Sequence, residues 1–199
     1  MGKKHGKGPN QPKVQPSFFQ QQRQKLGPDF MNRINPEIVR KNALKIFKDL
    51  ATGAINVEQE YDFFNRYDFT YALYQAALDN AKYNYFSYMG LYNYPGCAAD
   101  PEMVKVCQEH FDLYNLYNSI AVHLNNILQN ITLYQGIYTR HYLTQLVAEI
   151  RWKRYAFNGY FITIPKDNDK STIKKRREIP DHDQGFSNQG EGGFWDKSH

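Results

Sequence analysis

A long stretch without helix-breaking residues most constrains the fold of this 199-residue chain. Neither Gly nor Pro occurs from Val57 until Gly90. Apolar residues recur there at steps of three and four, the spacing that places them on one face of an α-helix. They are Phe63, Phe64, Tyr67, Tyr71, Tyr74, Leu78, Ala81, Tyr85 and Tyr88 or Met89. The pattern predicts one helix of about 50 Å, capped at Asn56, or two helices with a bend near Asp68.

Two other stretches carry helix start and stop signals. Asn35 and Pro36 predict a helix start, and Thr52-Gly53 predicts its end. Asp100-Pro101-Glu102 repeats the start signal, and Gly136 is expected to bend or split the helix that follows. The apolar stripe of this helix comprises Leu113, Leu116, Ile120, Leu124, Ile127, Ile131 and Tyr134, followed by Tyr138, Tyr142, Leu146 and Ile150.

These stretches predict an all-α fold, a bundle of three to five helices with antiparallel neighbours. We expect the helical core to span residues 36–159, flanked by a basic, Pro- and Gln-rich arm at 1–35 and an extended arm at 160–199. Few apolar residues occur in the arms, so the arms are not expected to add to the core. Tyr160–Pro165 reads as a short strand or an extended segment.

The net charge of +5 is unevenly distributed. Residues 1–35 contain seven Lys and Arg against one Asp, a net charge of +6. In the C-terminal arm, residues 166–177 carry +4, and residues 178–199 carry −4. The N-terminal arm could therefore contact nucleic acid or an acidic protein surface, or it could serve as a solubilising tail.

The C-terminal arm contains large apolar side chains that a plain linker does not need. Such residues are typical where an extended arm docks into pockets of a neighbouring protein. The candidate partner-docking residues are Phe161, Ile162, Ile164, Phe186, Phe194 and Trp195. The alternative is that they are incidental in a chain with 16% aromatic residues.

No catalytic, metal-binding or phosphate-binding motif is recognisable in the sequence. His110, His123 and His141 lie on predicted helices, where a polar face or a satisfied core position is the simpler interpretation. Cys97 and Cys107 form neither a disulfide framework nor a zinc set, and Cys107 is expected to be a small core residue. We therefore expect a non-enzymatic, intracellular protein without a cofactor, a metal or a membrane span.

The layout of helices over residues 36–158, an extended segment at 160–165 and an arm ending in Phe194-Trp195 resembles that of head-to-tail connector or neck-ring proteins of tailed bacteriophages. An abundance of Asn, Tyr and Lys also fits an A+T-rich phage genome. The chain carries no motif of that family, so the resemblance assigns no residue a role. It implies a structural subunit of a large homo-oligomer, located in the virion or the host cytoplasm, with other virion proteins as partners.

The alternative is a cytoplasmic nucleic-acid-binding or packaging accessory protein. Four adjacent cations at residues 174–177 and the basic N-terminal arm support it, because each phosphate contact adds salt-dependent affinity. The candidate contact residues are Lys3, Lys4, Lys7, Lys13, Lys174, Lys175, Arg176 and Arg177.

Overall fold

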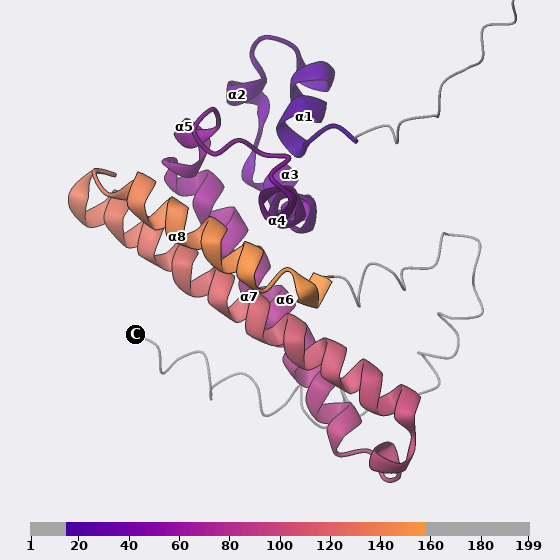
Figure 1. Cartoon of the computed structure of the whole chain (residues 1–199). Coiled ribbons are helices and arrows are strands. Elements are labelled where there is room, and N and C mark those ends of the chain that lie inside the picture. Colours follow the sequence, from indigo (N-terminus) through magenta and orange to yellow (C-terminus); the bar gives the residue numbers. More distant parts are fainter. Residues whose placement is uncertain (1–14, 158–199) are drawn as a thin grey trace, which may run out of the picture.

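The computed structural model describes residues 15–157, and every regular element in that range is a helix (Figure 1). The expected all-α fold is confirmed. The α-helices are α1 (Phe18–Leu26), α2 (Phe30–Arg33), α3 (Pro36–Lys41), α4 (Ala43–Thr52), α5 (Tyr61–Phe64), α6 (Tyr67–Tyr92), α7 (Pro101–Tyr134) and α8 (Thr139–Trp152). A 3-10 turn, η1 (Cys97–Ala99), lies between α6 and α7.

The fold begins earlier than the expected boundary at residue 36. The Ser17 side chain accepts a hydrogen bond from the Gln20 backbone and the Gln20 side chain accepts one from Ser17, a capping box that starts α1. Phe18 and Phe19 are completely buried in the main core. Residues 17–34 therefore belong to the folded unit and not to an arm.

Two polar contacts hold α1 on the rest of the fold. The Phe18 backbone N–H donates to Asp49 Oδ2 at 2.7 Å, which places a carboxylate at the positive end of the α1 dipole. Arg23 donates two hydrogen bonds of 2.6 Å to the Glu60 carboxylate. Arg23 is thus already paired within the fold and does not contribute to a free basic arm.

The helix predicted from Pro36 to Thr52 is divided at Asn42 into α3 and α4. Its predicted ends are correct: Asn35 accepts a hydrogen bond from the Ile38 backbone, and Gly53 closes α4 in the left-handed conformation. Asn42 Nδ2 donates to the Ile38 carbonyl at 2.8 Å, a local side-chain bond of the kind that competes with helix continuation.

The second predicted stretch is also two helices, separated at Asn65 and Arg66, just before the expected bend at Asp68. Asn56 accepts hydrogen bonds from the Glu58 and Gln59 backbones, but it caps only a turn, and α5 begins later at Tyr61. The start of α7 is as predicted, because Asp100 Oδ1 accepts from the Glu102 and Met103 backbones.

Helices α6 and α7 form a long antiparallel hairpin, and α8 folds back along α7 after a break at Gln135 and Gly136 (Figure 1). The short helices α1–α5 cover one end of this hairpin (Figure 1). A single core cluster joins all of these elements and extends along the hairpin as far as Ala81 and Leu113. Beyond that level, residues 82–112 project as a two-helix stalk that no other described helix covers (Figure 1).

Several tyrosines that the spacing placed on apolar stripes are exposed. These are Tyr67, Tyr71, Tyr134 and Tyr138. The other stripe positions of α7 from Leu113 to Ile127 are buried, as is Cys107. Spacing alone therefore does not place an aromatic residue in the core, and Tyr134 and Tyr138 lie next to the break between α7 and α8.

Candidate functional site

The site residues expected from sequence lie outside the described range of 15–157. This applies to the partner-docking residues Phe161, Ile162, Ile164, Phe186, Phe194 and Trp195. It applies equally to the cations Lys3, Lys4, Lys7, Lys13, Lys174, Lys175, Arg176 and Arg177. The surfaces that the structure describes are therefore those of the helical core.

Within residues 15–157 no group of three or more His, Cys, Asp or Glu side chains is placed to hold a metal ion. The arrangement most similar to a catalytic dyad lies between α7 and α8, where Lys153 Nζ donates to Ser119 Oγ at 2.6 Å. Lys153 also pairs with Glu149 at 2.9 Å, and this hydrogen bond is the main reason that the pKa of Glu149 is lowered. An ammonium committed to that ion pair cannot take a proton from Ser119, so the group acts as a clamp between the two helices.

The histidines also have structural surroundings. His110 Nδ1 lies 2.9 Å from Asn84 Oδ1 inside the stalk, and His141 lies 3.2 Å from the Gln145 amide on the surface of α8. His123 lies near Glu149, and its Nδ1 is buried without a hydrogen-bond partner in the described part of the chain.

Exposed apolar side chains are concentrated at the junction of α7 and α8. The four large residues of this turn surface are more than half exposed: Leu133 at 69%, Tyr134 at 54%, Ile137 at 73% and Tyr138 at 52%. They fall within six consecutive positions, so they form one local patch rather than scattered surface residues. The rings of Tyr134 and Tyr138 meet edge to face at 5.7 Å, which fixes two of the four against each other.

A buried polar network holds the turn surface in place. Asn130 accepts a hydrogen bond from the Tyr138 backbone at 3.0 Å and donates one to Thr139 Oγ1 at 2.6 Å. Thr139 in turn donates to Asn65 Oδ1 at 2.7 Å, which ties the turn to the segment between α5 and α6. Asn130 and Thr139 are almost fully buried, so these bonds are protected from water.

A second set of contacts fastens the same turn to α5. Gly136 has a positive φ of 79°, and its carbonyl accepts a hydrogen bond from the Tyr61 hydroxyl at 3.4 Å. The Arg140 guanidinium lies 4.7 Å from the centre of the Tyr61 ring and pairs with Glu58. The apolar side chains of the turn are consequently presented by a rigid backbone.

The α6 side of the stalk, at the opposite end of the hairpin, is rich in tyrosine and carries no charge beyond Lys82. No charged residue occurs between Lys82 and Asp100. The large exposed side chains of the stalk are Tyr83, Tyr92, Val104 and Phe111. Protein interfaces are enriched in aromatic residues and depleted in Lys, Glu and Asp at their centres, and the uncharged α6 side of the stalk matches that description.

The stalk has a small interior of its own. Leu91, Cys97 and Cys107 are buried there, and burial raises the pKa of the Cys107 thiol. The Tyr88 ring packs against Phe111 at 4.9 Å between centroids, linking α6 to α7. The stalk is therefore held by aromatic packing, and its exposed tyrosines lie on an ordered support.

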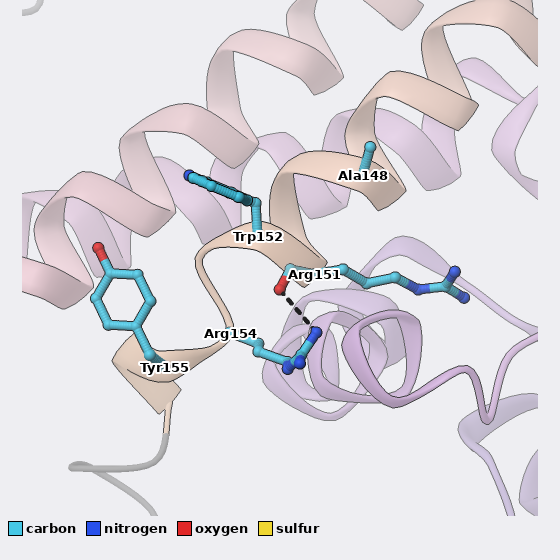
Figure 2. Close-up of a pocket in the computed structure, with 5 residues that line it drawn as sticks. All are labelled: Ala148, Arg151, Trp152, Arg154 and Tyr155. Atoms are coloured by element: carbon cyan, nitrogen blue, oxygen red, sulfur yellow. Dashed lines mark hydrogen bonds between the residues drawn. The ribbon is translucent and has the colours of Figure 1, made fainter.

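A third surface lies where α8 ends (Figure 2). An open hollow of about 500 Å³ is lined by Ala148, Arg151, Trp152, Arg154 and Tyr155, here called the Arg-Trp patch. Trp152 is 79% exposed, and Arg154 Nη1 donates to the Arg151 carbonyl at 3.2 Å. Figure 2 shows Trp152 and Tyr155 on the same side of the turn, while the Arg151 side chain extends the other way.

Sequence reasoning did not find these three surfaces. The residues of the turn surface flank Gly136, which signals a break in the helix but does not show which neighbouring side chains remain uncovered. The uncharged run from Tyr83 to Ala99 is visible in the sequence and is the one signal that could have indicated the stalk surface.

No protein-family model, curated protein or solved structure matches this chain. Among the described residues, no helix has both the length and the apolar character needed to cross a membrane.

Proposed function

We propose that this chain is a non-enzymatic structural subunit of a large homo-oligomer, of the type that builds the portal, neck or connector rings of a phage virion. The observation that carries the proposal is the turn surface, in which four large apolar side chains are more than half exposed on a buried polar support.

An apolar cluster of this kind gains free energy when a partner covers it. Each large side chain that is fully buried contributes about 1.5–3 kcal/mol. The backbone beneath is already ordered by the Asn130, Thr139 and Asn65 bonds, so little conformational entropy remains to be lost on docking. Rigid aromatic and aliphatic anchors are the usual centres of binding energy in protein interfaces.

The position of the two apolar surfaces favours a ring or a chain of subunits. The turn surface and the stalk lie at opposite ends of α7 (Figure 1), whose 34 residues correspond to about 50 Å. Two different surfaces on one molecule suit a heterologous, head-to-tail contact, which closes into a ring or continues as a filament. The proposed assignment to a virion rests on the layout of the sequence, and the arms expected to dock on partners lie outside the described residues.

The oligomeric state tests the proposal. We expect the full chain to be oligomeric by light scattering coupled to size-exclusion chromatography, and the double variant Leu133→Asp/Ile137→Asp to dissociate. Val122→Asp is the matched control, because Val122 is a half-exposed apolar residue of α7 outside both surfaces. A monomeric parent chain at high concentration, or a double variant as oligomeric as the control, would contradict the proposal.

A nucleic-acid-binding accessory protein is the second candidate. The Arg-Trp patch favours it, because cations next to exposed aromatic rings are the elements of single-strand recognition. The test is titration with DNA and RNA at 50 and 200 mM salt. Binding that weakens steeply with salt and is lost in Arg151→Glu/Arg154→Glu supports this function, and no binding at 50 mM excludes it.

A further inference from the structure

The Arg-Trp patch contains two cations that the described fold leaves without an acidic partner. Arg151 and Arg154 make no ion pair with any carboxylate in residues 15–157. Lys153, which lies between them in the sequence, is by contrast bound to Glu149 and Ser119. Trp152 and Tyr155, which line the same hollow as the two arginines, are more than half exposed. The patch is thus suited to a ligand that combines negative charge with apolar or aromatic groups.

One segment of this chain has that combination. Residues 178–199 contain five acidic residues and one basic residue, a net charge of −4. The same segment carries the aromatic side chains Phe186, Phe194 and Trp195. These 22 residues therefore contain both carboxylates that could pair with the two arginines and aromatic rings that could pack in the hollow.

The connection between patch and segment is short enough for both to meet in one molecule. The described chain ends at residue 157, two positions after Tyr155 of the patch, and 20 residues separate it from Glu178. Any chain of 20 residues spans at most about 70 Å, and a random coil of that length spans about 25 Å on average. A tether of this kind gives an effective concentration in the millimolar range, so even a weak contact would be occupied.

From these observations we propose that residues 178–199 dock on the Arg-Trp patch of the same molecule. Carboxylates of the segment pair with Arg151 and Arg154, and its aromatic rings pack against Trp152 and Tyr155. The segment is favoured over nucleic acid because it is covalently tethered, and because it supplies both carboxylates and apolar rings to a patch that has both cations and rings. The inference is independent of the proposed assembly function, since it concerns the isolated subunit.

The two tryptophans of the chain make a direct test possible. Trp195→Phe keeps an aromatic ring in the segment and leaves Trp152 as the single tryptophan. We expect the Trp152 fluorescence of this full-length variant to be blue-shifted, and at least twofold less quenched by acrylamide, relative to the same variant ending at Arg177. Circular dichroism of both proteins checks that the helical core is unchanged.

Charge variants show whether the arginines are needed for the segment to shield Trp152 from acrylamide. Arg151→Glu/Arg154→Glu in the Trp195→Phe chain should raise quenching to the level of the shortened chain, as should 500 mM NaCl. Lys105→Glu is the control, because this exposed cation belongs to the stalk, and it should change nothing. A synthetic peptide of residues 178–199 should restore protection to the shortened chain.

Three results would overturn the inference. Equal quenching in the full-length and shortened chains would show that the segment does not cover the patch. Protection that grows with protein concentration would assign the segment to a second copy. Protection of Trp152 by added DNA or RNA, with no effect of the segment, would assign the patch to nucleic acid.

Discussion

The Thr139 hydroxyl donates a hydrogen bond of 2.7 Å to the Asn65 side-chain oxygen and so joins the start of α8 to the break between α5 and α6. The two residues are 74 positions apart in the sequence. Because Thr139 also accepts a bond from Asn130, one buried hydroxyl links three separate parts of the fold and sets the position of the turn surface.

Replacing Thr139 by valine tests how much its two hydrogen bonds contribute to the free energy of unfolding. Valine matches the shape of threonine but leaves Asn130 Nδ2 and Asn65 Oδ1 without their partner, so we expect the free energy of unfolding to fall by about 2–4 kcal/mol. Urea denaturation measures the change. Thr144→Val is the control: this exposed hydroxyl bonds only to the Arg140 carbonyl, and its loss should cost less than about 0.5 kcal/mol. Equal effects of both variants would show that the network adds little.

Gly136 and Gly90 offer a matched pair of glycine substitutions. A Cβ on Gly136 would lie 2.3 Å from Asn65 Oδ1, and the residue has a positive φ. We therefore expect Gly136→Ala to destabilise the protein by about 2 kcal/mol or more. Gly90 lies inside α6 with open space around it, so Gly90→Ala should stabilise by about 0.5–1 kcal/mol. Thermal unfolding should move the melting temperature in opposite directions, and two shifts of the same sign would contradict the geometry.

The N-terminal helix should behave as part of the cooperative core. Phe19 is fully buried and its ring contacts Phe63 at 4.8 Å between centroids, so Phe19→Ala should cost about 3–5 kcal/mol. Met31→Ala, at a position of α2 that is 37% exposed, should cost less than about 1 kcal/mol. A chain beginning at residue 36 should lose stability, whereas one beginning at residue 15 should not. Retention of full stability by the shorter chain would place residues 15–35 outside the core.

The clamp between α7 and α8 predicts a pH dependence of stability. The hydrogen bond from Lys153 is the largest cause that lowers the pKa of Glu149 in the folded state. Such a group stabilises the fold above its ordinary pKa, and this contribution is lost as the pH falls through the lowered value. The free energy of unfolding of the parent chain should therefore decrease more between pH 5 and pH 3 than that of Glu149→Gln. Glu37→Gln, at a well-exposed ion pair, is the control and should follow the parent chain.

Local signals in the sequence predicted the helix ends well. Asn35 and Asp100 cap α3 and α7, Gly53 closes α4, and Gly136 separates α7 from α8. Each depends on a few adjacent residues whose side-chain or backbone preferences operate locally. The start of α1 has the same kind of signal in Ser17 and Gln20, which the surrounding glutamines and prolines obscured.

The break at Asn42 and the exposure of the turn surface could not be predicted in the same way, and the break at Asn65 was predicted only as an alternative, a bend near Asp68. Neither break coincides with Gly or Pro, and Asn65 is held by Thr139, which is distant in the sequence. Tyr134 and Tyr138 of the turn continue the helical spacing of their buried neighbours. Their exposure depends on the direction in which α8 packs along α7. That direction is a property of the tertiary fold, which the spacing of apolar residues does not predict.

The projection of the stalk beyond the main core has a consequence for its dynamics. The core cluster ends at Ala81 and Leu113, so the stalk can open without breaking the contacts of α1–α5 and α8. Regions with few contacts outside themselves open at a lower free energy than the global unfolding, and their backbone amides exchange hydrogen sooner. A partner that binds the stalk would therefore slow exchange there more than anywhere else in residues 15–157, and the protected amides would outline its footprint.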